Sequence, residues 1–170
     1  MNNKLLVLGT VAYDAIETPF GKTGKILGGC ATYIGLAASH FNTECGLISI
    51  IGSDFEEEHL NLLKEKNLNL EGVEQLQGEK TFFWSGKYHN DLNTRTTLDT
   101  KLNVLTKFQP KVPENFKNSS VVLLGNLDPN IQLEVLNQMD KKPDLIVMDT
   151  MNFWIESYRE KLDELIARVD

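Results

Sequence analysis

The sequence contains little cysteine: only Cys30 and Cys45 occur among its 170 residues. Two cysteines cannot supply the disulfide framework of a small secreted domain, so a reducing compartment is expected. The N-terminal stretch MNNKLLVLGTVAYDAI also lacks an apolar run long enough for a signal peptide or a membrane span. We therefore expect a cytoplasmic protein with no membrane partner.

Positive charge is scarce as well. The chain has 17 Lys and Arg residues against 24 Asp and Glu residues, which gives a formal net charge of −7. An acidic chain is poorly suited to bind a nucleic-acid backbone or an anionic membrane. The remaining composition, 41% hydrophobic and 24% charged, is typical of a globular domain with a core.

Several signatures of other protein classes are missing. The tripeptide at 21–23 (GKT) resembles the end of a phosphate-binding P-loop, but Ile16 stands where the first glycine belongs. His40, His59 and His89 are too widely spaced for a structural zinc site. No Gly-x-Gly-x-x-Gly follows the first strand, and no Gly-x-Ser-x-Gly occurs, which disfavours a general Rossmann domain and an α/β-hydrolase.

Short apolar runs alternate with helical patterns along the chain. This alternation predicts an α/β sandwich with a mostly parallel central sheet. The predicted strands are Lys4–Gly9, Cys45–Ile51, Val121–Leu124 and Leu145–Met148, and the predicted helices are Cys30–Phe41, Phe55–Lys66, Asn130–Met139 and Trp154–Val169. We expect Ser53 or Asp54 to cap the second helix, and Glu71–Val73 to lead into a turn at Gly78.

Two segments, Ala12–Lys25 and Lys80–Leu105, are too polar for the central sheet. Their threonines, aromatic residues and turn formers predict short strands and hairpins in a separate small sheet. The last predicted helix runs almost to Asp170, whereas such a helix normally delivers the chain to another strand. We therefore interpret the chain as truncated at its C-terminal side.

Two stretches carry a recognisable order of motifs. The first is VLGTVAYDAI followed by GGCATYIGLAASHF, and the second is LISIIGSDFEEEHLNLLKEKNLNLEGV. Together they resemble the PfkB/ribokinase family of sugar and nucleoside kinases. The strand-end segments LLGNLDP and VMDTMNFW also fall where the family has comparable loops. The resemblance covers most of the 170 residues and rests on the order of several motifs.

The resemblance implies that residues 1–170 are the N-terminal part of a ribokinase-like α/β domain, with lid segments at about 12–27 and 80–105. It implies a sugar or nucleoside substrate, with ATP and Mg²⁺ bound mainly through the C-terminal half. The family's catalytic base lies in a Gly-Ala-Gly-Asp motif, which this chain lacks. We therefore expect no catalytic residue here and no activity from the isolated chain.

The first candidate substrate residues lie at the end of the first strand. Asp14 follows that strand, where open α/β sheets bind ligands, and the resemblance gives it the role of binding sugar hydroxyls. Gly28 and Gly29 precede a helix whose backbone N–H groups can face a ligand. The alternative is that Asp14 forms a turn and that the two glycines form a tight strand-to-helix connection.

Two further candidates depart from the family pattern. Tyr33 stands where many members have a substrate-binding Asn, so it is either a ligand contact or a core aromatic residue. Asn152, in the segment Asp149-Thr150-Met151-Asn152, resembles a family loop between substrate and nucleotide, although helix capping explains Asp149 and Asn152 equally well. Trp154 replaces an Arg that is common in members acting on acidic sugars.

The predicted small sheet carries its own group of polar and aromatic residues. Lys87, Asn90 and Arg95 are candidates for binding a substrate phosphate or carboxylate, while Trp84 and Tyr88 offer flat surfaces. The alternative is an exposed sheet or a homodimer contact. A non-enzymatic module that binds a small molecule or dimerises also stays open as the function.

Overall fold

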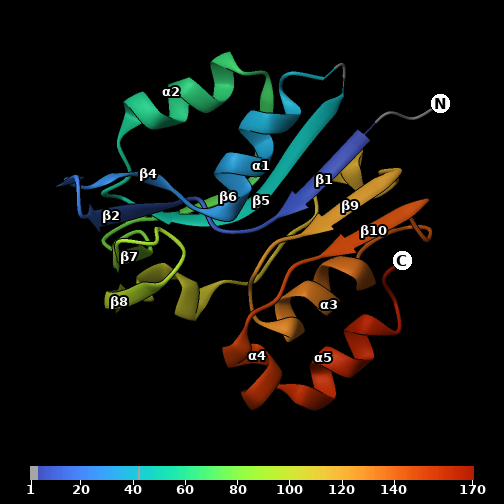
Figure 1. Cartoon of the computed structure of the whole chain (residues 1–170). Helices are drawn as coiled ribbons and strands as arrows, with labels where there is room; N and C mark the ends of the chain where they lie inside the picture. Colours follow the sequence, from blue (N-terminus) through green and yellow to red (C-terminus); the bar gives the residue numbers. More distant parts are fainter. Residues whose placement is uncertain (1–3, 42) are drawn as a thin grey trace.

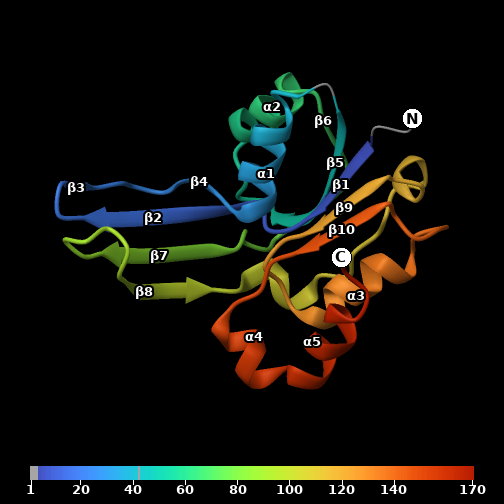
Figure 2. The same cartoon turned by 45° about the vertical axis from the view of Figure 1, so that its right-hand side comes forward.

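A five-stranded parallel sheet forms the centre of the protein, with helices on both faces and a second sheet extending to one side (Figures 1 and 2). The computed structural model describes residues 4–41 and 43–170. The architecture confirms the predicted α/β sandwich with a mostly parallel central sheet and a second, smaller sheet.

The central sheet has the strand order β10-β9-β1-β5-β6, and every pairing in it is parallel. Its apolar sequences suit strands that are buried on both faces. The bounds are β1 (Lys4–Leu8), β5 (Glu44–Gly52), β6 (Leu68–Leu76), β9 (Val121–Leu124) and β10 (Leu145–Met148).

Helices divide between the two faces of this sheet (Figure 2). On one face lie α1 (Cys30–Ala38) and α2 (Glu57–Glu65), which enclose a core that includes Val7, Leu47 and Leu63. On the other face lie α3 (Pro129–Asn137) and α5 (Arg159–Ile166), with α4 (Asn152–Ser157) beside them and a second core. Two short 3₁₀ helices, Asn103–Lys107 and Glu114–Phe116, complete the list.

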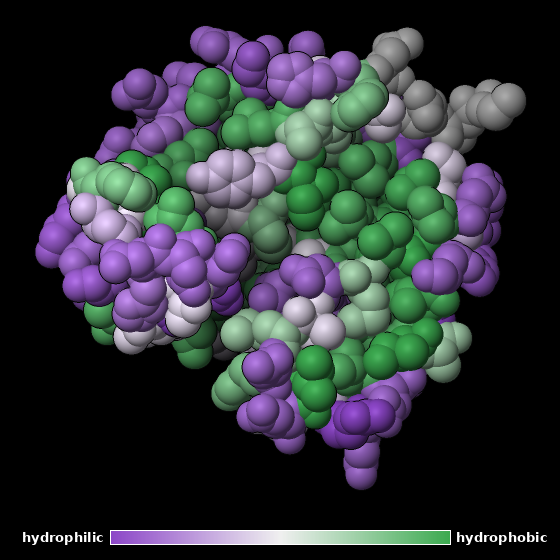
Figure 3. Space-filling view, viewed as in Figure 1, coloured by the Kyte–Doolittle hydropathy of each residue, from purple (hydrophilic) through white to green (hydrophobic). Residues whose placement is uncertain are grey.

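Part of the face that carries α1 and α2 has no covering helix among the described residues. The strand register places Leu145 beside Val121 and Val147 beside Leu123 on this face. Leu145 is 43% exposed and Val147 is 40% exposed. Figure 3 shows hydrophobic residues gathered over β1, β9 and β10 on the side facing the viewer. Parallel sheets normally bury both faces, so this apolar surface is unusual.

The second sheet has the order β3-β2-β7-β8, and β4 pairs with β2 on the same edge as β3. Thr, Ile and aromatic side chains favour these pleated, half-exposed strands. The bounds are β2 (Ala12–Thr18), β3 (Gly21–Lys22), β4 (Ile26–Gly28), β7 (Phe83–Tyr88) and β8 (Arg95–Lys101). The sheet begins where β1 ends, so it projects from the C-terminal edge of the central sheet (Figure 2).

Several local predictions differ from the structure. The predicted turn at Gly78 is present, but Glu71–Val73 lies within β6, a nine-residue strand that pairs with β5. The mixed polar pattern of β6 gave no clear strand signal. Neither Ser53 nor Asp54 caps α2, because Glu56 holds the N-cap position and the Asp54 carboxylate is bonded to Thr81 instead.

The predicted final helix is also two helices. Tyr158 separates α4 from α5, because its backbone (φ −131°, ψ 32°) leaves the helical region. Its ring packs edge-on against Trp154 with centroids 5.2 Å apart, and the break lets α5 return along α3 (Figure 1). The first helix is shorter than predicted too, since it ends at Ala38.

Candidate ligand-binding site at the strand ends

Asp14 lies on β2 directly beyond the C-terminal end of β1, half-buried against the start of α1. Burial raises the pKa of its carboxyl group, and a hydrogen bond from the backbone of Gly29 partly opposes that rise. The charged carboxylate is therefore held at a position where it costs stability. A buried charge of this kind at a strand end is more typical of a binding residue than of a simple turn residue.

The two glycines allow the carboxylate to sit there. A Cβ atom at Gly28 would lie 2.2 Å from an oxygen of Asp14, so no other residue fits without moving the carboxylate. Gly29 has φ +95°, and its Cβ would lie 2.2 Å from the carbonyl oxygen of Thr10. Both positions therefore require glycine for reasons that are visible in the local geometry.

Backbone N–H groups at the start of α1 are hydrogen-bonded within the protein. The N–H of Cys30 donates to Oγ1 of Thr10 at 3.1 Å, and the N–H of Ala31 donates to the Thr10 carbonyl at 3.0 Å. Thr10 also donates its own N–H to Sγ of Cys30 at 3.4 Å. Together with the bond from Gly29 to Asp14, these contacts already use several N–H groups that the sequence suggested for a ligand. The glycines thus serve the placement of Asp14.

Tyr33 lies one turn into α1 with 56% of its surface exposed. Its hydroxyl donates to the carbonyl of Leu27 on β4 at 3.3 Å. Tyr33 is therefore not a core aromatic residue. It joins α1 to the second sheet at the base of that sheet.

Trp84 lies beside Asp14 on the second sheet, because the two residues are register partners on β7 and β2. Its indole covers Gly86, where a Cβ atom would lie 2.2 Å from the ring. The indole N–H donates to Oγ1 of Thr97 at 3.3 Å, which fixes the ring on that face. A carboxylate and an aromatic ring thus share one face of the sheet.

Lys87 does not share that face. It pairs in register with Glu17, three residues beyond Asp14, so strand alternation places it on the opposite side. Its Nζ lies 2.8 Å from Glu17, which also pairs with Lys22 at 2.6 Å. Hydrogen bonds from Lys22 and Lys87 lower the pKa of Glu17 to about 2.

Asn90 and Arg95 lie at the far end of the β7–β8 hairpin. Arg95 pairs with Tyr88, four residues along β7 from Trp84, which corresponds to about 13 Å of strand. Asn90 is in the exposed turn that Asp91 organises by accepting hydrogen bonds from the N–H groups of Asn93 and Thr94. The structure does not bring these two residues to Asp14.

Asn152 is the first residue of α4, and Asp149 follows β10; both are exposed. Neither caps the helix, because Met151 is at the N-cap and makes no side-chain capping bond. Beneath this loop lies Gln132 of α3, whose Nε2 donates to the carbonyl of Asp149 at 3.1 Å. The sequence did not lead us to Gln132, although a signal for it was present. Gln132 precedes Val135 by three residues and Leu136 by four, so it is a polar residue on an apolar face of the helix.

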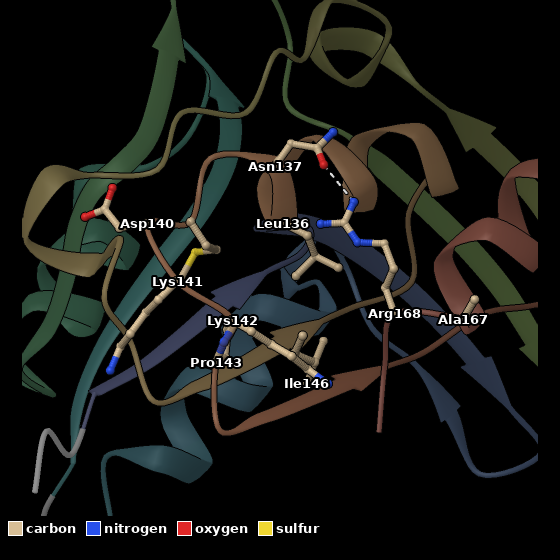
Figure 4. A pocket seen from close by; sticks show the side chains of 10 residues that line it. Leu136, Asn137, Asp140, Lys141, Lys142, Pro143, Ile146, Ala167 and Arg168 are labelled. Carbon is tan, nitrogen blue, oxygen red and sulfur yellow. Dashed lines mark hydrogen bonds between the residues drawn. The ribbon is translucent and has the colours of Figure 1, made fainter.

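A shallow pocket of about 580 Å³ lies at the other end of the strands (Figure 4). Its lining comes from the end of α3, the start of β10 and the residues after α5, and includes Ile146 and the Asn137–Arg168 hydrogen bond. Ligands of open α/β sheets bind beyond the carboxyl ends of the strands, so this pocket is not part of the candidate site.

The described residues supply no donor set for a metal. Within 4–41 and 43–170, no three His, Cys, Asp or Glu side chains lie together in a way that could hold an ion. No helix in the same ranges has the length and apolar character needed to cross a membrane.

The fold is ribokinase-like, as comparison with solved structures shows. A nucleoside kinase of Methanocaldococcus jannaschii, an archaeal member of the ribokinase family, superposes with a TM-score of 0.78 at 18% identity. That match covers 99% of this chain and 59% of the other. A nucleoside kinase of Burkholderia thailandensis, solved with inosine, gives a TM-score of 0.75 at 15% identity over 97% of this chain and 58% of the other.

Among characterised proteins, the chain is 29% identical over 170 residues to a cytidine kinase of Thermococcus kodakarensis. The match covers 98% of this chain and 59% of that protein, so the chain spans about three fifths of its relative's length. No family model matches. These findings confirm the predicted resemblance to the PfkB/ribokinase family.

Proposed function

We propose that the chain is the substrate-binding and lid portion of an ATP-dependent kinase that phosphorylates a hydroxyl group of a nucleoside. Cytidine is the first substrate to test, because the relative that matches nearly the whole chain is a cytidine kinase. The observation that carries the proposal is the half-buried Asp14 carboxylate, held at the strand end by the Gly28-Gly29 turn.

Asp14 suits a ligand with neighbouring hydroxyl groups. An ionised carboxylate has only acceptor sites, and the bond from Gly29 uses one of them. Two hydroxyl donors of a ribose can pair with the remaining sites through charge-assisted hydrogen bonds. Such bonds favour the charged form, so they would offset the cost of burying it.

The second sheet suits a lid over that ligand. Trp84 offers an aromatic surface next to Asp14, and Tyr33 offers an exposed ring at the base of the sheet. Closure of such a sheet would exclude water from the reacting phosphoryl group. Asp14 and Tyr33 are the ligand contacts we propose, and Gly28 and Gly29 contribute by placing the Asp14 carboxylate, whereas Lys87 faces away from Asp14.

Phosphoryl transfer would need residues beyond those described. A kinase must hold ATP and Mg²⁺ and place a base next to the substrate hydroxyl. The described residues provide no such metal site, and the relative is longer than the matched region. The uncovered apolar face of β9 and β10 is a suitable surface for a further segment to pack on. We therefore propose that the isolated 170 residues bind substrate without transferring phosphate.

The proposal is tested by assaying the natural protein that contains these residues with ATP, Mg²⁺ and a panel of nucleosides and sugars. We expect ADP formation with a pyrimidine or purine nucleoside, lost in Asp14→Asn and retained in Asp99→Asn. Asp99 is the matched control, because it lies on the opposite face of the same sheet. If no compound in the panel leads to ADP formation, the proposed kinase activity is wrong. If a nucleoside binds without ADP formation, the result favours a non-enzymatic binding module.

A further inference from the structure

Gln132 is a fully buried polar residue at the C-terminal edge of the central sheet. Its Nε2 donates to the carbonyl of Gly125 at 2.8 Å and to that of Asp149 at 3.1 Å, with a longer contact to Leu124 at 3.4 Å. Gly125 follows β9 and Asp149 follows β10. One amide group from α3 therefore joins the loops that leave two neighbouring strands.

A second hydrogen bond joins the loop after β9 to the helix that follows Asp149–Asn152. The indole Nε1 of Trp154 donates to Oδ1 of Asn126 at 2.8 Å. Trp154 belongs to α4, whose first residue is Asn152, and Asn126 belongs to the loop after β9. Gln132 thus holds the loop at Asp149, and Asn126 holds the helix that the loop leads into.

The hydrogen bonding beneath this loop is incomplete. Oε1 of Gln132 and Oγ1 of Thr150 are both buried, and neither has a partner in the part of the chain that the structure describes. Gln132 bonds to the very peptide group that joins Asp149 to Thr150. Buried polar atoms are nearly always paired, so two unpaired oxygens beside one peptide distinguish this place from the rest of the described core.

We propose that Gln132 is a positioning residue, which sets the place of the Asp149–Asn152 loop for the nucleoside that we expect at the strand ends. It is buried and touches no ligand itself, so it acts through Asp149 and the start of α4. This inference rests on the proposed function for its ligand, and on the hydrogen bonds to Gly125 and Asp149 for its geometry.

The test compares Gln132→Met with Gln138→Met in the natural protein that contains these residues. Gln138, at the C-cap of the same helix, is a matched control, because its Nε2 donates to the carbonyl of Pro110 at 2.9 Å and its Oε1 accepts from Val112 at 3.0 Å, away from the loop. Methionine keeps the length of the side chain and removes the amide.

We expect Gln132→Met to lower kcat/KM for the nucleoside about tenfold, mainly by raising KM, at a temperature where both variants are folded. Gln138→Met should lose stability by a comparable amount and keep its KM. Gln132→Glu should regain part of the affinity as the pH falls, because a protonated carboxyl group again has a donor for one of the two carbonyls. Equal KM values in the two methionine variants would overturn the proposal.

A second readout separates this inference from the proposed function. Amide hydrogen exchange should become faster at Asp149, Trp154 and Ile155 in Gln132→Met but not in Gln138→Met. If the unaltered protein accepts no nucleoside, the proposed function fails, and this exchange pattern alone decides whether Gln132 holds the loop. Unchanged exchange at those three amides would show that it does not.

Discussion

The carboxylate of Asp54 accepts both the backbone N–H and the hydroxyl of Thr81, each at 2.7 Å. Thr81 is buried, and its Oγ1 in turn accepts the N–H of Gly52 at 3.0 Å. Thr81 stands just before β7, and Gly52 ends β5. This pair therefore anchors the second sheet to the central sheet, and Lys25 adds an ion pair to Asp54 at 3.3 Å.

Replacing Asp54 with Ala should destabilise the fold by about 3 kcal/mol, because two donors of buried Thr81 lose a charged acceptor. Urea unfolding of the 170-residue chain measures this change. The partly exposed Asp99, which pairs with Lys101 at 3.3 Å, is the control, and Asp99→Ala should cost no more than about 0.5 kcal/mol. Similar losses in both variants would mean that Asp54 is not an anchor.

Asp54 and Asp14 should give pH dependences of opposite sign. Burial raises the pKa of Asp54, but hydrogen bonds from Thr81 and the nearby Lys25 outweigh it, so the net shift is downward. Its contribution to stability is present above the ordinary value of 3.8 and is lost as the pH falls through the lower folded pKa. The unaltered protein should therefore exceed Asp54→Asn in free energy of unfolding at neutral pH, and this difference should decrease as the pH falls.

The pKa of Asp14 is raised, chiefly because of burial, so the charged form of Asp14 destabilises the fold at neutral pH. Asp14→Asn should raise the melting temperature at pH 7, and the gain should fade as the pH falls below the raised folded pKa toward 3.8. The same variant should weaken nucleoside binding by tenfold or more, through lost charge-assisted hydrogen bonds. Thermal melts and calorimetric titrations check the two effects, and a destabilised Asp14→Asn would contradict the assigned sign.

The sequence made the central sheet predictable, because Leu5–Leu8 and Val121–Leu124 are short apolar runs typical of strands in a parallel sheet. The β6 strand was not predictable in the same way. Its residues, such as Glu71 and Glu74, are half polar because the strand is at the sheet edge, where one side faces solvent. The other edge strand, β10, has an apolar run at Leu145–Met148 and was therefore predicted.

The candidate site was predictable only in its local parts. Asp14, Gly28 and Gly29 are close in sequence, so a strand-turn-helix pattern brings them together. Gln132 bonds to Asp149, 17 residues away on another element, and such a contact depends on how α3 packs beneath two loops. The face on which Lys87 lies likewise depends on the strand register, which composition does not specify.

The need for glycine in the Gly28-Gly29 turn can be tested by adding a Cβ atom. Gly29→Ala should destabilise the chain by more than Gly78→Ala, although both residues have positive φ, +95° and +76°. A Cβ at Gly78 would meet nothing within 4 Å, so its cost is the backbone term of about 1 to 2 kcal/mol. At Gly29 the Cβ would also strike the carbonyl of Thr10. Equal unfolding free energies for the two variants would mean that the turn relaxes freely.

The uncovered face of the central sheet predicts the behaviour of the isolated chain. Leu145 and Val147 present apolar side chains to solvent on a strand at the sheet edge, so we expect the 170-residue chain to self-associate at micromolar concentrations. Val147→Lys should reduce this association severalfold, as measured by sedimentation velocity. Leu98→Lys is the control, because Leu98 is an exposed leucine, 56% accessible, on the second sheet. If Leu98→Lys has the larger effect, the second sheet is the contact between copies, as a homodimer through that sheet would require.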